Sequence, residues 1–213
     1  MINSLYIKAL LTFNPTRLFE KINQLGWYQS TLHNWINDSQ LSNNTVLEVG
    51  CSSGSLTQYL AECGFKPTGV DLSANSIQIA QAKYPNLSFE KQDINQLTYA
   101  NNSFDNVIAA SVVNIVADKQ KALSEMLRVC KKGGKVSVLM PNKSFSQQQF
   151  DELLSSLKLK GFSLAALKTW HKRAPKMDGD ALKQLFFDAG IDDLKVSYYL
   201  NGMVFGVVGV KKN

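Results

Sequence analysis

The sequence predicts an α/β protein built on a doubly wound, mostly parallel sheet that ends in an antiparallel hairpin. From Thr45 onward, short apolar runs alternate regularly with segments of helical periodicity. Near-continuous apolar strands separated by helices are typical of a parallel sheet that is covered on both faces. Near the end of the chain, Asn201-Gly202 lies between two apolar runs, and this dipeptide is the strongest short indication of a hairpin.

The alternating elements follow one another in a regular order. Strands are predicted at Thr45–Val49, Lys66–Val70, Leu87–Lys91, Phe104–Ala110 and Lys135–Met140, and helices at Ser55–Cys63, Ala74–Lys83 and Asp118–Lys131. Gly133-Gly134 is predicted to cap the C-terminus of the last of these helices. The sheet core is therefore expected to occupy residues 45–141.

Flanking regions complete a single predicted domain of residues 1–213. Residues 1–40 are expected to form a helical cap with two or three short helices within Ile2–Ile36, Pro15 starting one and Trp27-Tyr28 opening the third. Residues 142–179 form a predicted insert or lid, which is helical at Gln147–Leu157 and irregular at Lys158–Lys176. Residues 180–213 comprise the predicted helix Asp180–Ala189, which ends at Gly190, and the hairpin strands Leu194–Leu200 and Met203–Val210.

Length and cysteine content limit the class of protein. A chain of 213 residues fits one α/β domain whose core is large enough to need no disulfide. The three cysteines, Cys51, Cys63 and Cys130, form no Cys-x-x-Cys pair, which argues against a disulfide framework or a zinc site. The only histidines, His33 and His171, lie far apart in sequence, so no metal is expected.

The chain has no predicted targeting or membrane-spanning segment. Lys8 interrupts the apolar N-terminal stretch, and no small-residue cleavage site follows it. No segment approaches the ~18 consecutive apolar residues of a transmembrane helix. A cytoplasmic location is therefore expected.

The net charge of +6 is unevenly distributed. Residues 1–120 carry seven Lys/Arg against nine Asp/Glu, whereas residues 121–213 carry sixteen against eight. One stretch without any acid contains Lys158, Lys160, Lys168, Lys172, Arg173 and Lys176, interleaved with Phe162, Leu164, Leu167 and Trp170. Such a run is compatible with a solvated face, an anionic small substrate, an anionic membrane surface or RNA, although no RNA-binding module is appended to the domain.

The most informative stretch is Val46–Ser55, where an apolar strand runs into an acid, a small-residue loop and a helix start. Gly50 and Gly54 lack a Cβ, so the backbone can turn sharply and a ligand can lie against it. Glu48 discriminates between ligands, because a carboxylate would repel a pyrophosphate at a helix N-terminus. S-adenosylmethionine (SAM) carries an ammonium and a sulfonium instead, and an acid at the strand end suits both charges.

Further acids follow the next strands. Asp71 closes the second strand, 21 residues after Gly50, where a carboxylate can accept hydrogen bonds from both ribose hydroxyls of a nucleoside. Asp93-Ile94 follows the third strand. Ala110-Ser111 ends the fourth strand, at the carboxyl edge where open α/β sheets bind their ligands. The sequence therefore predicts a nucleoside site lined by Glu48 and Asp71, whereas Asp93 on its own would indicate a loop or cap.

In this order, the motifs resemble those of the class I SAM-dependent methyltransferases, and most closely the methyltransferase type 11 group that includes ubiquinone and menaquinone pathway enzymes. The resemblance covers about Trp27 to Lys212 and is best at Val46–Leu60, Gly69–Lys83, Phe89–Leu97 and Ser103–Pro141. It implies a Rossmann-like sheet of seven strands with the C-terminal hairpin. It also implies a cofactor-binding core at residues 45–141, SAM as methyl donor and S-adenosylhomocysteine as product.

The resemblance implies individual cofactor contacts. Glu48, Gly50 and Gly54 match the acid and the first and last glycines of the family's first motif, whose middle glycine is replaced here by Ser52. Leu72 would contact adenine, Asp93 would accept from its amino group, and the backbone N–H of Ile94 would meet a ring nitrogen. The predicted cofactor-binding residues are Glu48, Gly50, Cys51, Ser52, Gly54, Asp71, Leu72, Asp93, Ile94 and Ser111.

The acceptor side is less defined. The family's Asn/Asp-Pro-Pro-aromatic signature is absent from Ser111–Asn114, which argues against methylation of an exocyclic amine on a base or of a glutamine side chain. Methyl transfer depends mainly on positioning, and only some acceptors need a general base. The candidate catalytic residues are His171 and Tyr28, with a surface role for His171 and a packing or cofactor role for Tyr28 as alternatives. Candidate substrate-binding residues are Tyr28, Trp170, His171 and Arg173.

Taken together, these features predict a methyltransferase that moves a methyl group from SAM to a small, anionic or aromatic acceptor. One alternative is a non-catalytic SAM-binding regulatory protein, which the lack of an obvious base permits. Another is a nicotinamide-dependent oxidoreductase, whose Gly-x-Gly-x-x-Gly fingerprint would require glycine in place of Ser52 and Ser55. The acceptor atom and the oligomeric state are not determined by the sequence.

Overall fold

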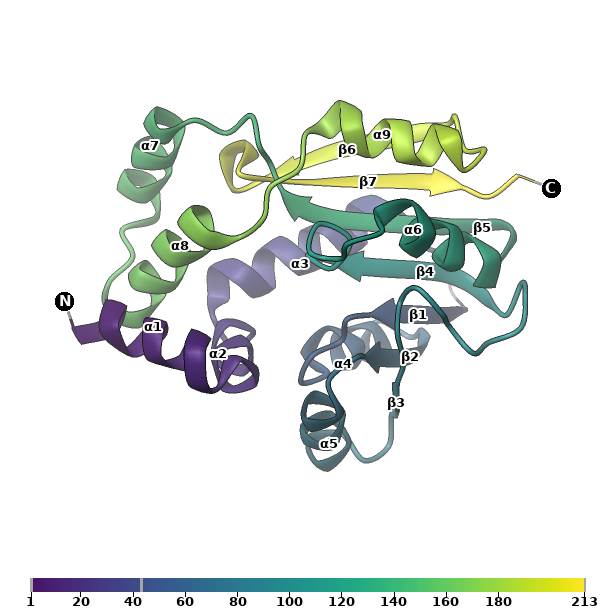
Figure 1. Ribbon diagram of the computed structural model, residues 1–213, viewed down its shortest axis with the longest axis horizontal. Helices are drawn as coiled ribbons and strands as arrows, with labels where there is room; N and C mark the ends of the chain where they lie inside the picture. Colours follow the sequence, from purple (N-terminus) through teal and green to yellow (C-terminus); the bar gives the residue numbers. More distant parts are fainter. Residues whose placement is uncertain (1, 43, 213) are drawn as a thin grey trace.

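A seven-stranded sheet forms the centre of the computed structural model, which describes residues 2–42 and 44–212 (Figure 1). Its spatial order is β3-β2-β1-β4-β5-β7-β6. The strands are β1 (Thr45–Val49), β2 (Lys66–Asp71), β3 (Ser88–Lys91), β4 (Phe104–Ala110), β5 (Cys130–Pro141), β6 (Leu194–Tyr199) and β7 (Val204–Val210). β1 to β5 pair in parallel, and β7 runs antiparallel to both β5 and β6. The predicted α/β architecture and its C-terminal hairpin are confirmed.

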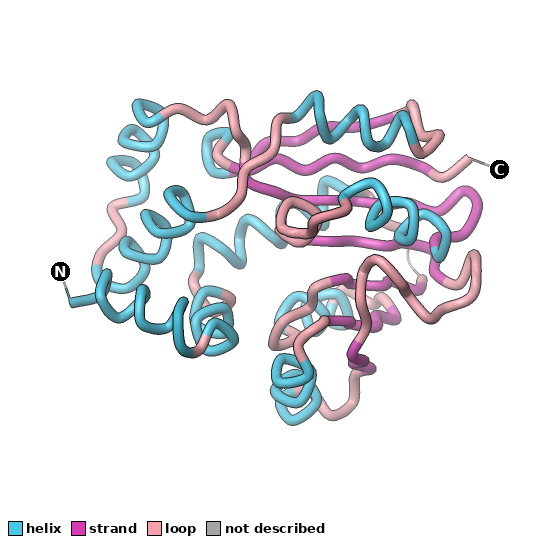
Figure 2. Tube along the Cα trace, in the orientation of Figure 1, coloured by secondary structure: helices cyan, strands magenta, loops and turns pink. Residues whose placement is uncertain are grey.

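Some helices pack along the sheet, and others form a separate group at the end of the molecule that holds the N-terminus (Figure 2). They are α1 (Ile2–Phe13), α2 (Pro15–Ile22), α3 (Gly26–Ser39), α4 (Ser55–Glu62), α5 (Ala74–Lys83), α6 (Lys119–Val129), α7 (Gln147–Leu157), α8 (Gly161–Arg173) and α9 (Gly179–Asp188). Pro15 is the first residue of α2, where its missing N–H costs nothing. No helix of the described residues is both long enough and apolar enough to span a bilayer.

The strands bury alternate residues on opposite faces of the sheet, as the period of two requires. Leu47, Val107 and Val138 belong to the core under α6 and α9. Val46 and Ile108 belong to the second core, which contains residues of α3, α4 and the N-terminal helices. The two faces are therefore covered separately, and the parity of a strand residue decides which set of helices its side chain meets.

Helix α3 is fixed to the sheet through Trp35. The indole Nε1 donates to Ser137 Oγ of β5 at 2.8 Å, and Ser39 Oγ lies 2.9 Å from the same hydroxyl. The indole also lies against Gly206 of β7, where a Cβ would come within 2.8 Å of Trp35 Cδ1. This contact requires glycine in the strand, and it sets the position of the whole helix, including Tyr28 at its other end.

The predicted helix cap at Gly133-Gly134 is wrong. Helix α6 ends at Val129, and strand β5 begins at once with Cys130, whose Sγ contacts the carbonyl of Asp105. Gly133 has a φ of +72°, and the pairing of β4 with β5 shifts between Cys130 and Lys135. A Cβ on Gly134 would lie 2.5 Å from the Asp105 carbonyl oxygen. The glycines therefore permit an irregularity in the strand rather than the end of a helix.

The prediction of irregular backbone at Lys158–Lys176 is also wrong, because most of this segment forms α8. Its inward face buries Ala166, Leu167 and His171. Only these three positions are buried, one of them is a histidine, and Lys168, Lys172 and Arg173 lie among them, so the helical period is hidden in the sequence. The neighbouring helix α7 is confirmed with its predicted bounds, and its N-terminus has a Ser146/Gln149 capping box.

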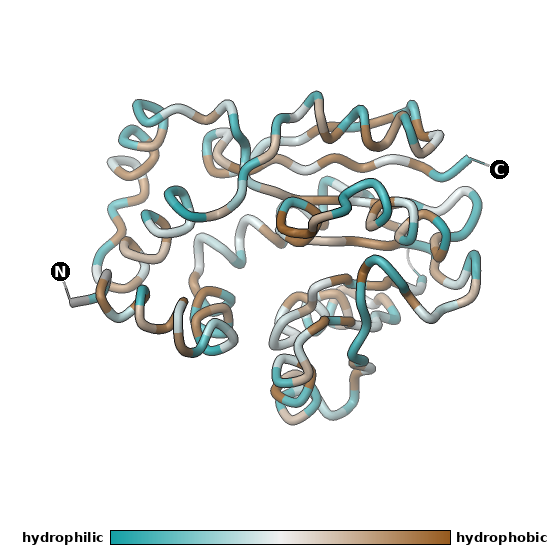
Figure 3. The backbone as a smooth tube through the Cα atoms, viewed as in Figure 1, coloured by the Kyte–Doolittle hydropathy of each residue, from teal (hydrophilic) through white to brown (hydrophobic). Residues whose placement is uncertain are grey.

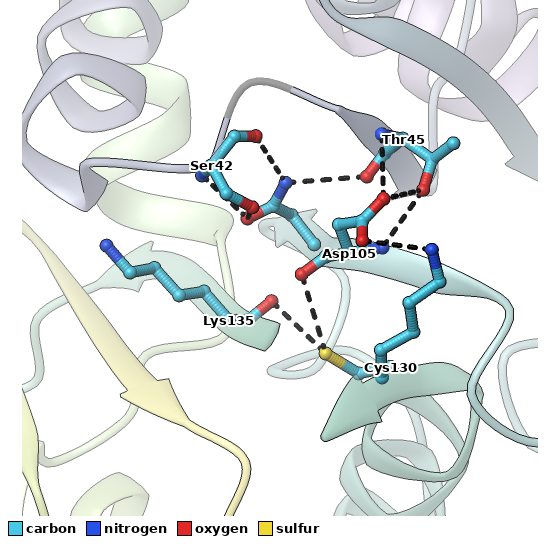
Figure 4. Close-up of polar contacts among 7 residues, drawn as sticks. Ser42, Thr45, Asp105, Cys130 and Lys135 are labelled. Atoms are coloured by element: carbon cyan, nitrogen blue, oxygen red, sulfur yellow. Dashed lines mark hydrogen bonds and ion pairs between the residues drawn. The ribbon is translucent and has the colours of Figure 1, made fainter. Parts of the chain in front are cut away.

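A polar network ties the amino ends of β1, β4 and β5 together (Figure 4). Asp105 accepts from Thr45 N at 3.1 Å and Thr45 Oγ1 at 2.5 Å, and from Lys131 Nζ at 2.9 Å. Although burial raises the pKa of Asp105, these hydrogen bonds and the positive charge of Lys131 outweigh it and hold that pKa below its usual value. The carboxylate therefore stays charged in the folded protein.

Replacing Asp105 by Ala is expected to destabilise the chain without weakening ligand binding at the opposite edge. The change leaves the half-buried Thr45 N–H and hydroxyl without their acceptor, which costs about 1–3 kcal/mol of unfolding free energy. Urea denaturation would measure the loss, and calorimetric titration would show whether cofactor affinity stays the same. A parallel loss of affinity in the folded variant would contradict the assignment of this network to stability alone.

Candidate functional site

Glu48 lies near the carboxyl end of β1 and points to the side of the sheet covered by α3 and α4. It shares the parity of Val46, which packs in that core. Thr57 of α4 donates its hydroxyl to Glu48 Oε2 at 2.5 Å. The residue is only 4% exposed, and burial raises the pKa of Glu48 to about 7, an effect that Thr57 opposes and the negative charge of Asp71 reinforces. Glu48 is thus a buried carboxyl that a cation would convert to its charged form.

Two glycines shape the loop that follows β1. Gly50 has a φ of +81° and Gly54 a φ of +80°, a region that side chains rarely allow. A Cβ on Gly50 would lie 2.1 Å from Val112 Cγ2, and one on Gly54 would lie 2.6 Å from Phe89 Cζ. The loop is therefore held between the segment after β4 and the ring on β3, and neither glycine can be replaced without displacing a neighbour.

The loop also contains two buried hydroxyls that have no partner. Ser52, at the position of the family's middle glycine, adopts a φ of +51°. Its Oγ and that of Ser53 are buried and find no hydrogen-bond partner among residues 2–42 and 44–212. A buried polar group without a partner is costly. These hydroxyls, the glycine turns and the Glu48 carboxyl together fit a polar ligand that would lie against this loop.

Asp71 joins the loop to the end of β2. Its Oδ2 accepts from Ser52 N at 3.0 Å, and its Oδ1 accepts from Ser73 N at 2.8 Å. The Ser73 hydroxyl in turn accepts from Ser76 N at 3.2 Å and so caps the N-terminus of α5. Each carboxylate oxygen can accept more than one hydrogen bond. Asp71 therefore has a structural role that the sequence did not reveal, and it retains capacity for ligand hydroxyls.

The predicted adenine contacts lie on the neighbouring turns. Leu72 is 65% exposed directly after Asp71, so it offers apolar surface that a flat ring would cover. Asp93 is exposed after β3, and its Oδ1 accepts from Asn95 N at 2.8 Å. Ile94 is buried in the core on the α6 side, so only its backbone could meet a ligand.

Ser111 follows β4 with a φ of +57°, and its N–H donates to the Leu139 carbonyl of β5 at 2.7 Å. This turn directs the next residue, Val112, across the sheet edge onto Gly50. Asn114 then donates to the Pro175 carbonyl at 2.8 Å and so ties this loop to the segment after α8. The structure thus brings the loops after β1, β2 and β4 together at one edge.

An aromatic cluster connects α3 with α8 beside this edge. Trp27 stacks on Trp170 with ring centroids 5.6 Å apart, and Tyr28 meets Trp170 edge-on at 5.6 Å. Trp27 Nε1 also donates to Ser163 Oγ at 3.0 Å. Burial and the negative charge of Glu48 raise the pKa of Tyr28 to about 12. The electrostatic influence of Glu48 places Tyr28 near the site, and its hydroxyl stays protonated at neutral pH.

The alternative of a surface position for His171 is wrong. Its ring is 8% exposed and stacks on Phe150 of α7, with centroids 3.9 Å apart. Burial and the positive charge of Lys176 lower its pKa, whereas Asp151 raises it. The charges that act on it come from the insert and not from the carboxylates around the loop. Of the two predicted catalytic candidates, His171 thus lies on Phe150 of α7, whereas Tyr28 lies against Trp170 of α8.

Of the other predicted site residues, one lies in the loop after β1 and one lies on the outer surface of α8. Cys51 is buried under the loop, and burial together with Glu48 raises the pKa of its thiol, which is therefore unreactive. Arg173 is exposed on the outer surface of α8, next to α1. Thr57, the hydrogen-bond donor to Glu48, was not predicted. Its only indication in the sequence is a polar residue between the buried Leu56 and Leu60 of α4.

Solved structures share this architecture. A SAM-dependent methyltransferase of Thermotoga maritima, described as a possible histamine N-methyltransferase, superposes with a TM-score of 0.69 at 19% identity over 92% of this chain and 98% of its own. Phosphoethanolamine N-methyltransferase 2 of Haemonchus contortus, solved with SAM, gives a TM-score of 0.65 at 16% identity over 88% of this chain and 53% of its own. At such identities these likenesses establish the fold.

Curated relatives are more similar in sequence. A demethylmenaquinone methyltransferase of Renibacterium salmoninarum is 34% identical over 93 residues, which cover 44% of this chain and 39% of the relative. A ubiquinone biosynthesis O-methyltransferase of Coxiella burnetii is 32% identical over 109 residues, 49% of this chain and 47% of the relative. The chain thus matches less than half of the length of either relative.

A family model described as a methyltransferase domain matches residues 40–190. This range contains the sheet from β1 to β5, the loops around Glu48 and Asp71, and the insert with α7 and α8. The match covers well over half of the chain and agrees with the fold and with the resemblance found in the sequence. The chain belongs to the methyltransferase domain family.

Proposed function

We propose that this protein is a SAM-dependent methyltransferase that acts on a small-molecule acceptor and releases S-adenosylhomocysteine. The observation that carries the proposal is the buried Glu48 carboxyl, with a pKa of about 7, beside a glycine-bounded loop at the carboxyl edge of the sheet. An uncompensated buried carboxyl is destabilising unless it titrates or meets a cation. The ammonium and sulfonium of SAM supply positive charge of the required kind.

The described residues fit this cofactor. Glu48 and the orphan hydroxyls of Ser52 and Ser53 would hold the methionine portion against the loop. Asp71 would accept from the ribose hydroxyls while it keeps its bonds to the loop. Exposed Leu72 would cover one face of the adenine ring. Asp93 and the backbone of Ile94 remain the proposed partners of the adenine edge.

When bound, SAM supplies an electrophilic methyl group on a positively charged sulfur. The task of the chain is then to hold an acceptor in line with that methyl and to exclude water, which accounts for most of the rate advantage. Tyr28, with a pKa of about 12, remains a hydrogen-bond donor and not a resting base. Together with Trp27 and Trp170, it would form an apolar wall beside the loop and shield the reacting centre.

We propose that the acceptor is small and carries aromatic or anionic character. The aromatic cluster favours a flat acceptor, and the two curated relatives are named as a demethylmenaquinone methyltransferase and a ubiquinone biosynthesis O-methyltransferase. The position of His171 among the rings of α7 and the Phe145 loop argues against its direct contact with the acceptor. Acceptors that need no strong base are therefore favoured.

Calorimetric titration with SAM and S-adenosylhomocysteine tests cofactor binding, and failure of both to bind at high micromolar concentration would refute the proposal. Turnover of methyl-labelled SAM with a metabolite extract then tests catalysis. Binding without transfer to any acceptor would instead favour the non-catalytic SAM-binding alternative. A spectral shift on addition of reduced nicotinamide cofactor would favour the oxidoreductase, which membership of the methyltransferase domain family argues against.

Replacing Asp71 by Ala is expected to lower SAM affinity roughly tenfold to a hundredfold, which corresponds to ~1–3 kcal/mol. The variant loses the ribose acceptor and also the bonds that hold Ser52 N and Ser73 N. Asp71→Asn keeps one carbonyl acceptor and serves as the control with a smaller expected loss. Titration of both variants against SAM is the measurement, and an unchanged affinity of Asp71→Ala would remove Asp71 from the site.

A further inference from the structure

A basic groove lies between α1 and α8, on the outer surface of the insert. It has a volume of about 710 Å³, and its walls contain Lys8 from α1 and Lys168, Lys172 and Arg173 from α8. Leu11 and Leu164 provide apolar lining. No lining residue is acidic, and none of these cations has a carboxylate within 4.0 Å in the described part of the chain. Four unneutralised cations thus share one groove.

The helix beside this groove exposes large apolar side chains. Leu5 and Phe13 of α1 are 65% and 85% exposed, and Phe19 of α2 is 50% exposed. Leu5, Ala9 and Phe13 recur every four residues, so they form one stripe along α1, away from the buried Ile7 and Leu10. Half of the exposed large apolar residues found in the described chain belong to the first 19 residues. Such a concentration on one helix pair indicates a partner.

The apolar stripe and the basic groove share one end of the molecule. Figure 1 shows α1, α2 and α8 together at the end of the molecule opposite the C-terminus, and Figure 3 shows hydrophobic stretches along α1. Lys8, which belongs to the wall of the groove, lies on α1 within one turn of Leu5 of the stripe. A flat partner could therefore meet the apolar side chains and the cations at the same time.

We propose that this surface, formed by α1 and the outer face of α8, docks onto an anionic lipid bilayer. An interfacial helix buries Leu and Phe side chains at the boundary of the acyl chains, while nearby lysines and arginines meet anionic headgroups. RNA would bind the cations but would gain nothing from the exposed Leu5 and Phe13. It therefore accounts for the basic groove but not for the apolar stripe. The two features together match a surface that is both anionic and apolar beneath its headgroups.

Docking on this surface would also bear on the site. Helix α8 carries Lys168 and Lys172 on its outer face, and its Trp170 contacts Tyr28 on its inner face. A bilayer that holds α8 would hold the aromatic cluster as well. The binding itself does not depend on the proposed catalytic function, and it can be tested without an acceptor.

The test is cosedimentation of the full chain with vesicles of phosphatidylcholine alone or of an equimolar mixture with phosphatidylglycerol. The wild-type chain is expected to bind the anionic vesicles at least ~tenfold more tightly, and high salt is expected to weaken that binding. The double variant Lys168→Glu/Lys172→Glu is expected to lose at least ~tenfold in affinity. A matched control, Lys66→Glu/Lys132→Glu, makes the same change of net charge at exposed residues elsewhere and should bind nearly as the wild type.

A second variant separates the bilayer from other polyanions. Leu5→Ser/Phe13→Ser leaves every charge in place and is expected to weaken vesicle binding several-fold, with little effect on a single-stranded RNA probe. Thermal melting checks that each variant is folded, and Lys168→Gln/Lys172→Gln replaces the charge-reversal pair if that pair melts early. The proposal is overturned if wild type ignores anionic vesicles, if both Lys→Glu pairs lose binding equally, or if RNA binds more tightly than vesicles and is insensitive to Leu5 and Phe13.

Discussion

Replacing Glu48 by Gln is expected to weaken SAM binding and, at alkaline pH, to stabilise the ligand-free chain. The amide keeps the shape of the side chain, and its oxygen can still accept from Thr57 Oγ1. It cannot carry the charge that meets the ammonium. Loss of a buried charge-assisted contact is worth ~2–3 kcal/mol, or a roughly thirtyfold to hundredfold loss of affinity.

The stability effect follows from the pKa of Glu48, which burial raises from 4.5 to about 7. Below pH 4.5 the carboxyl is protonated in both the unfolded and the folded chain and costs nothing. As the pH rises towards 7, the unfolded chain ionises first, so the folded chain loses stability, by roughly 3 kcal/mol once the pH exceeds 7. The Gln variant lacks this loss, so its melting temperature should exceed that of the wild type at pH 8 and not at pH 4.

Cofactor binding should show the opposite pH dependence. A cation beside Glu48 lowers its pKa, so binding near neutral pH releases a proton, and the affinity of the wild type should rise as the pH increases from 6 to 8. Burial raises the pKa of both Tyr28 and Cys51, so neither group ionises in this range. Asp71 carries a charge that raises the pKa of Glu48 and belongs to the same site.

The measurement is calorimetric titration across this pH range in two buffers of different ionisation enthalpy. Glu152→Gln, an identical chemical change on the exposed surface of α7, should alter neither affinity nor its pH dependence. A wild-type affinity that is flat between pH 6 and 8, with no proton release, would show that no cation meets Glu48. If Glu48→Gln were less stable than the wild type at pH 8, this would contradict the inference that the Glu48 carboxylate is buried without a compensating positive charge in the ligand-free chain.

The fold could be predicted because each core element has a clear local pattern. Ala74–Lys83 follows a serine N-cap, and Phe104–Ala110 contains the apolar run Val107–Ala110, and both elements were predicted with their observed bounds. Gly133-Gly134 was misinterpreted because a glycine pair after a helix usually caps it. Here the close approach of the Asp105 carbonyl, which belongs to another strand, requires a residue without Cβ. That contact is not local in sequence.

A site residue could be predicted from the sequence only where its role follows from its position at the end of a strand. Glu48 and Asp71 lie at strand ends, and the parallel sheet brings those ends to one edge. Thr57 and Val112 were missed because their importance comes from what they touch, one an acid on β1 and the other a glycine after it. His171 was misinterpreted for the same reason, since the charged residues beside it in sequence conceal the rings around it in space.

Replacing Gly50 by Ala is expected to be the most disruptive single change in the site. The residue has a φ of +81°, and its added Cβ would lie 2.1 Å from Val112 Cγ2. Two separate costs therefore add: the strain of a side chain at positive φ, about 1–2 kcal/mol, and displacement of the segment that follows β4, about 1–3 kcal/mol. Because that segment covers the loop, SAM affinity should fall with stability.

The two costs can be measured separately within this chain. Gly64 has a φ of +89°, and a Cβ there would have no neighbour within 4 Å, so Gly64→Ala reports the backbone strain alone. Val112→Ala removes the methyl that collides, so the double variant Gly50→Ala/Val112→Ala should recover at least ~1 kcal/mol relative to the sum of the single variants. Urea denaturation of the four variants gives these differences. If Gly50→Ala costs no more than Gly64→Ala, or if Val112→Ala restores nothing, the loop after β1 is not held by the segment after β4, and the geometry assigned to the cofactor site is wrong.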